Sequence, residues 1–144
     1  MATKNITKTK IDLIVETGKD GHYWGRIEDK GFMPTGQGKS IKALIQNVKD
    51  CIEDYQQHEG KNNAFWGRIN LNALEFNLKY DLHAFFEVFD AIKISNIAKK
   101  AGLNESLVRQ YATGSKFPSI EQVKKVEKAI HDLGKELQKV KIYV

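Results

Sequence analysis

The stretch ISNIAKKAGLNESLVRQY, residues 94–111, determines the fold of the C-terminal half of this 144-residue chain. Its pattern predicts a helix that ends at Gly102, a tight turn, and a second helix capped by Asn104. Gly102 suits the end of a helix because glycine adopts a left-handed backbone without steric cost. The small side chain of Ala98 lets two helices cross closely, and the apolar residues of both helices predict one shared core. We therefore interpret this stretch as a helix-turn-helix.

These residues, followed by TGSKFPS at 113–119, resemble the Cro/Xre class of phage-repressor helix-turn-helix domains over residues 81–133. The resemblance implies that the ligand is double-stranded DNA and that the second helix enters the major groove. The residues expected to read bases are Glu105, Ser106, Arg109, Gln110 and Thr113. The residues expected to contact phosphates are Lys93, Ser95, Lys99, Lys100, Asn104 and Lys116.

The chemistry of the outward residues suits base recognition. Arg109 offers paired hydrogen bonds to guanine O6 and N7, and Gln110 offers them to adenine N6 and N7. Glu105 can accept from cytosine N4, and Ser106 suits either a base or a phosphate. The alternative is a structural three-helix module whose polar face meets only water or another protein.

Charge is distributed unevenly along the chain. Residues 1–60 carry nine basic and nine acidic side chains, whereas residues 91–144 carry eleven basic and five acidic ones. The net charge of +5 therefore arises entirely beyond residue 60. This asymmetry favours a polyanionic partner for the second half, although lysines that only maintain solubility would also produce it.

The N-terminal half predicts a small sheet crossed by one helix. Extended segments are predicted at residues 10–17, 23–28, 32–35, 65–66 and 74–78. A turn at 18–21 joins the first two segments, and a helix begins after Ser40. The tetrapeptide WGRI occurs at 24–27 and again at 66–69, which chance or similar strand edges explain better than a repeat architecture.

The order β-β-β-α-β, with the turn KDG at 19–21 and the run GQGKS at 36–40, resembles the HicB antitoxin family over residues 10–80. Members are described as degenerate RNase H folds, and they frequently carry a C-terminal helix-turn-helix. RNase H chemistry needs several carboxylates that converge on two metal ions. Asp12 and Glu16 share a strand face, but Ile14 lies between them on that face, and no further acid falls at an obvious position. We therefore expect no enzyme, with no catalytic residue, metal site or cofactor.

A long helix is expected after Ser119. Its apolar seam consists of Val123, Val126, Ile130, Leu133, Leu137 and Val140. These residues recur at alternating spacings of three and four, which is typical of paired helices. The seam is longer than a small domain needs to cover its core. We therefore predict that its end is the contact of a homodimer or higher homo-oligomer. The alternative is that this end folds back on its own domain. Residues 141–144 are predicted as a terminal strand.

We thus expect an α+β protein of two domains, a HicB-like sheet and helix at 1–78 and an all-α helix-turn-helix domain at 79–144. A cytoplasmic location is expected, because residues 1–5 lack the apolar core of a secretory signal and no run is long enough to span a membrane. The single cysteine, Cys51, forms no internal disulfide.

The sequence predicts a DNA-binding antitoxin of a type II toxin–antitoxin system. Its first domain would neutralise a HicA-like ribonuclease toxin, and its helix-turn-helix would act as a transcription repressor of its own operon. The alternative is an orphan helix-turn-helix transcriptional regulator whose N-terminal domain serves oligomerisation or another partner. The third hypothesis is an enzyme of RNase H descent, for which we expect no nuclease activity.

Overall fold

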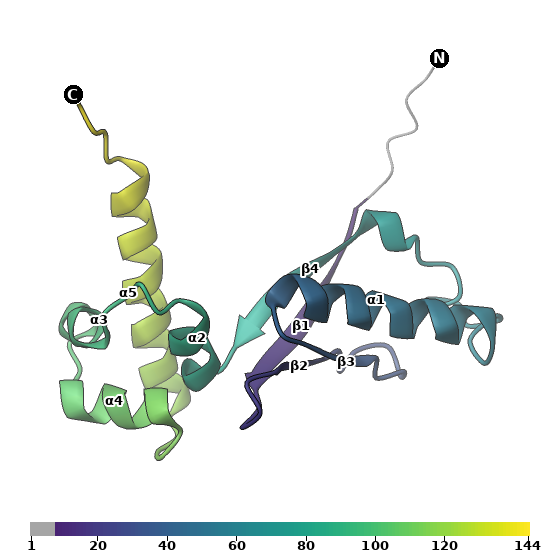
Figure 1. Ribbon diagram of the computed structural model, residues 1–144, viewed down its shortest axis with the longest axis horizontal. Helices are drawn as coiled ribbons and strands as arrows, with labels where there is room; N and C mark the ends of the chain where they lie inside the picture. Colours follow the sequence, from purple (N-terminus) through teal and green to yellow (C-terminus); the bar gives the residue numbers. More distant parts are fainter. Residues whose placement is uncertain (1–7) are drawn as a thin grey trace. The chain divides into compact units, whose positions relative to one another are not determined.

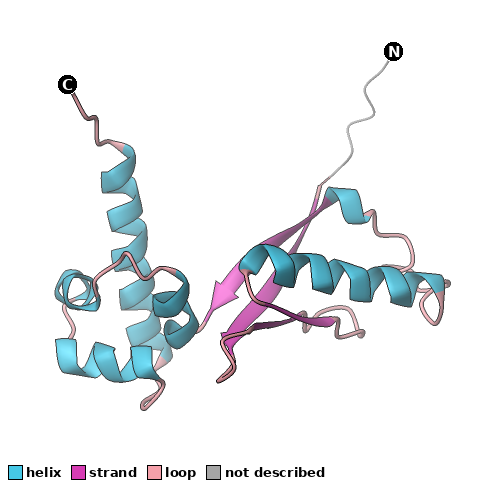
Figure 2. Ribbon diagram, in the orientation of Figure 1, coloured by secondary structure: helices cyan, strands magenta, loops and turns pink. Residues whose placement is uncertain are grey.

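The computed structural model describes residues 8–144, so the expectation about residues 1–5 lies outside the described part. The chain divides into two compact units, Met1–Asp81 and Leu82–Val144. Within the described residues, every strand lies in the first unit, and the second is built from helices and loops (Figure 2). The predicted α+β fold is confirmed. No helix in residues 8–144 combines the length and apolarity needed to cross a bilayer.

The first unit holds a four-stranded sheet in the order β3-β2-β1-β4. The strands are β1 (Thr9–Thr17), β2 (Tyr23–Arg26), β3 (Thr35–Gly38) and β4 (Leu74–Tyr80). Strand β1 pairs antiparallel with β2 and parallel with β4, and β2 pairs antiparallel with β3. Helix α1 (Ile41–Gln57), capped by Ser40 as predicted, lies across one face of the sheet (Figure 1).

The alternation along β1 determines which face of the sheet is covered. Ile11, Leu13 and Val15 are buried, whereas Asp12 and Glu16, which alternate with them, are exposed. The buried side chains join one core with the apolar stripe of α1, namely Leu44, Val48 and Ile52. Asp12 and Glu16 therefore lie on the face of the sheet opposite to α1.

Two glycines of β3 allow α1 to approach the sheet closely. A Cβ atom at Gly38 would lie 2.6 Å from the backbone nitrogen of Leu44, and one at Gly36 would lie 2.9 Å from that of Val48. The prediction of a third strand at 32–35 is wrong in position, because β3 occupies Thr35–Gly38. The preceding residues instead form a turn through positive φ angles at Lys30 and Gly31.

The segment at 61–70 connects α1 to a single 3₁₀ turn, Leu71–Ala73, before β4. The prediction of an extended segment at 65–66 is wrong, because these residues lie in turns. The side-chain amide of Gln56 donates to two carbonyl oxygens of this segment, at 2.7 and 2.8 Å. Asn63 Oδ1 accepts from the N–H groups of Phe65 and Trp66. Because side chains satisfy these backbone groups, the segment needs no neighbouring strand.

The second unit holds helices α2 (Leu82–Val88), α3 (Ile94–Ala101), α4 (Glu105–Thr113) and α5 (Ile120–Gln138). Ile97, Val108 and Val126 are fully buried and come from α3, α4 and α5, so the three helices share one core. His83 Nδ1 lies 2.5 Å from the carbonyl oxygen of Ala112 and thereby joins α2 to the last turn of α4. Helix α3 packs against both α4 and α5, and α4 also packs against α2 (Figure 1).

The C-terminal end of the chain differs from its prediction. Residues 141–144 form no strand, so the predicted terminal strand is wrong. A strand needs a partner ladder, and within its own unit the described chain offers none. Helix α5 ends at Gln138, so the predicted helical seam stops before Val140; Leu137 near the end of the helix is 61% exposed, and Val140 beyond it is 57% exposed.

Gly38→Ala is expected to destabilise the first unit by about 1–3 kcal/mol, because the added methyl group must displace the backbone of α1. Gly134→Ala is a matched control in α5, where a Cβ atom would meet nothing within 4 Å. That change should raise stability by about 0.5–1 kcal/mol, since alanine favours helix interiors. Urea unfolding followed by circular dichroism measures both effects, and a stabilising Gly38→Ala would contradict the close approach.

Candidate nucleic-acid interface

The helix-turn-helix forms at the residues where the sequence predicts it. Helix α3 ends at Gly102, whose left-handed φ of 70° lets its N–H group reach carbonyl oxygens of the last turn. Helix α4 begins after Asn104, whose side-chain oxygen accepts from the N–H group of Leu107 at 3.3 Å. Lys93 precedes α3 without a side-chain cap. The turn between the helices is thus fixed at both ends by local hydrogen bonds.

The outward face of α4 carries all five residues predicted to read bases. Val108, Tyr111 and Ala112 are buried against the rest of the unit. At roughly 100° per residue, the five predicted residues occupy one continuous arc of about 140° on the remaining side. Gln110 is half-buried. The other four are exposed, namely Glu105, Ser106, Arg109 and Thr113.

Three of these five side chains are held by neighbours on the protein: Glu105 and Arg109 by each other, and Thr113 by Gln110 and Ser115. Arg109 donates from Nε at 3.1 Å and from Nη2 at 2.6 Å to the same oxygen of Glu105. The hydroxyl of Thr113 donates to the carbonyl oxygen of Gln110 at 3.2 Å and lies 2.8 Å from the hydroxyl of Ser115. Thr113 therefore helps to close the C-terminal end of α4, whereas Ser106 points outward without such a bond among residues 8–144.

The residues predicted to contact phosphates fall into two groups. Lys93, Lys99 and Lys116 are exposed and form no ion pair within residues 8–144. Lys100 differs, because its Nζ lies 2.6 Å from Glu136 Oε1 on α5. The structure therefore assigns Lys100 to the contact between α3 and α5.

The two polar residues of the phosphate set differ from each other in exposure and in the bonds that they form. Ser95 is half-buried on α3. Asn104 uses its side-chain oxygen to cap α4, which leaves its NH₂ group as the donor for an anion. These two side chains can supply short polar contacts, while the lysines supply the charge.

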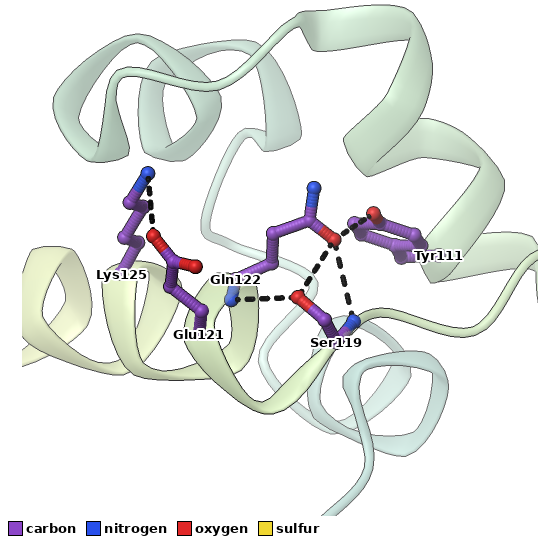
Figure 3. Close-up of polar contacts among 5 residues, drawn as sticks. All are labelled: Tyr111, Ser119, Glu121, Gln122 and Lys125. Atoms are coloured by element: carbon purple, nitrogen blue, oxygen red, sulfur yellow. Dashed lines mark hydrogen bonds and ion pairs between the residues drawn. The ribbon is translucent and has the colours of Figure 1, made fainter.

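A polar cluster joins the last turns of α4 to the start of α5 (Figure 3). The hydroxyl of Tyr111 donates to Gln122 Oε1 at 2.5 Å. The same oxygen accepts from the backbone of Ser119, whose side chain accepts in turn from the N–H group of Gln122. Sequence reasoning missed this function of Gln122, although the spacing S-x-x-Q at 119–122 is the signature of a capping box. The cluster fixes the orientation of α4 against α5.

The charge around α4 is strongly positive. Residues 93–116 hold five basic side chains and one acidic one. The single acid, Glu105, is paired with Arg109 at 2.6 Å, so these two charges compensate each other and the net positive charge comes from the lysines. The exposed lysines therefore give the surface beside the polar arc of α4 a positive charge.

The face of the sheet opposite to α1 has a different character. Asp12 lies 2.6 Å from Lys79 and accepts from Asn77 at 3.3 Å, and both contacts lower the pKa of Asp12 below its usual range. Glu16 pairs with Arg26 at 2.8 Å. The two carboxylates thus have separate basic partners, and residues 8–144 contain no group of three side chains suited to a metal ion.

The two surfaces therefore differ in the charge that they present. Opposite charges on the sheet compensate one another, whereas α4 and its neighbouring lysines keep an uncompensated positive charge. No family model matches this chain, and neither a curated protein nor a solved structure matches it.

Proposed function

We propose that this protein is a DNA-binding transcriptional repressor whose helix α4 enters the major groove. The observation that carries the proposal is the polar arc of α4, flanked by lysines without an ion pair in the described chain. Arg109 and Gln110 have the donor and acceptor patterns that recognise purine edges. Lys93, Lys99 and Lys116 position the protein through phosphates without reading sequence.

Within this function, we assign the chain to antitoxins of the HicB type. The second unit would repress the antitoxin's own operon, and the first would bind a HicA-like ribonuclease toxin. The order β-β-β-α-β of the first unit and the helix-turn-helix that follows it support this assignment. The alternative is an orphan regulator whose first unit serves oligomerisation or another partner. An adjacent reading frame for a small toxin distinguishes the two, and in either case the protein acts in the cytoplasm.

The repressor would act as a homodimer or a higher homo-oligomer. Two half-sites about 34 Å apart multiply both affinity and specificity when two copies bind together. The C-terminal end of α5 and the residues just beyond it supply a contact for the second copy, because Leu137 on α5 and Val140 after its end are exposed apolar side chains. Pairing of two such ends would remove the exposed apolar side chains from water.

Arg109→Ala is expected to weaken binding to the gene's own promoter by about 1–3 kcal/mol, because paired hydrogen bonds to a base are lost. Gel-shift titration measures this affinity, and sedimentation of the complex should give two chains for each operator. Arg68→Ala is a matched control, since it removes the same charge from an exposed position of the first unit. Equal affinities for Arg109→Ala and the unchanged protein would contradict the proposed recognition face.

A further inference from the structure

The guanidinium group of Arg109 is only partly used by its contact with Glu105. Both of its bonds, from Nε at 3.1 Å and Nη2 at 2.6 Å, lie along one edge of the planar group. The other edge, formed by Nη1 and Nη2, still presents two parallel N–H groups. Two parallel donors are what the O6 and N7 acceptors of guanine require in the major groove.

We infer that Glu105 is a positioning residue that holds Arg109 ready for one guanine of the operator. The inference rests on the proposed function and names the base that this site recognises. It also replaces the prediction that Glu105 itself reads cytosine. Arginine loses much rotational freedom when it is fixed, so a contact already present in the free protein removes that cost from binding.

The position of the pair on α4 supports this role. Glu105 is the first residue of the helix, where a carboxylate is stabilised by the helix dipole. Arg109 lies four residues later, and the order glutamate then basic residue is the favourable one for such pairs. A carboxylate facing DNA would repel phosphates, and the ion pair with Arg109 offsets that repulsion. Glu105 thus contributes orientation without opposing the positive field.

Selection of bound sequences from a random duplex library, using the full chain, tests the inference. The unchanged protein should enrich a site with one guanine whose preference disappears in Arg109→Ala. Glu105→Ala should weaken the preference at that same base pair about tenfold, because Arg109 loses its support. Its affinity for non-specific duplex should remain equal or rise, since a negative charge is removed.

Two further variants separate positioning from a general effect. Glu105→Gln keeps an oxygen that can accept from Arg109, so it should retain most of the guanine preference. Glu121→Ala removes the same charge from the pair that Glu121 forms with Lys125 on α5, and it should leave the preference unchanged (Figure 3). Circular dichroism of each variant should match that of the unchanged protein, because both glutamates are exposed.

Three results would overturn the inference while leaving DNA binding intact. They are an unchanged preference in Glu105→Ala, a loss at a different base pair from that of Arg109→Ala, and a preferred base other than guanine at the shared pair. A loss at a different pair would indicate that Glu105 reads a base directly. If the unchanged protein enriches no duplex sequence, the proposed function itself fails, and that result is distinct from the other three.

Discussion

Trp66→Ala is expected to lower the free energy of unfolding of the first unit by about 3–5 kcal/mol. Trp24→Ala should cost about 1 kcal/mol or less, because that side chain is 46% exposed. Both residues begin the tetrapeptide WGRI, so the two variants make the same change in the same local sequence. The difference between them measures the tertiary contacts of Trp66, namely its packing and its indole hydrogen bond.

The large expected cost has identifiable contacts behind it. Trp66 is fully buried, and its ring lies edge-on to Phe32 at 5.9 Å and to Phe65 at 5.0 Å between centroids. Its indole Nε1 donates to the carbonyl oxygen of Lys30 at 3.3 Å. Truncation to alanine leaves a cavity and removes the donor of this part-buried bond.

Urea unfolding followed by circular dichroism compares the two variants without relying on tryptophan fluorescence. The transition midpoint should fall clearly for Trp66→Ala and only slightly for Trp24→Ala, with similar slopes. Equal losses for the two variants would show that the turn at 61–70 does not depend on the buried ring.

The identical tetrapeptides also show where sequence reasoning succeeds and where it stops. The alternation in β1 and the helical spacing in α1 are local patterns, and both elements occur where they were predicted. The first three residues of WGRI lie in strand β2 at the first occurrence, whereas the same three residues lie in turns, at 66–68, at the second. Local sequence cannot separate these outcomes, because the second conformation depends on Gln56 and Asn63 outside the tetrapeptide.

The candidate site divides in the same way. The caps at Gly102 and Asn104 and the outward face of α4 follow from helical periodicity, and the structure places them as expected. The pairing of Lys100 with Glu136 joins residues 36 positions apart in the sequence, so no local sequence pattern predicts it. The bond from Tyr111 to Gln122 is of the same kind, because it depends on how α4 and α5 pack.

Duplex binding is expected to weaken about a thousandfold between 50 and 200 mM salt, because released counterions drive the association. Lys93, Lys99 and Lys116 of two chains would neutralise roughly six phosphates, which gives a slope of about −5 in log affinity against log salt. Fluorescence anisotropy titrations at several salt concentrations measure this slope. A slope near zero would contradict phosphate contacts by these lysines.

Adjacent lysines provide the decisive comparison for this slope. Lys99→Ala should make it shallower by about 2 for a dimer, since one phosphate contact is lost from each chain. Lys100→Ala removes the same charge from the next residue, but its Nζ already lies 2.6 Å from Glu136. The slope should therefore stay unchanged in Lys100→Ala. Equal changes of slope in the two variants would mean that binding depends only on the total charge of the protein. A change in Lys99→Ala without one in Lys100→Ala would locate the phosphate backbone beside Lys99.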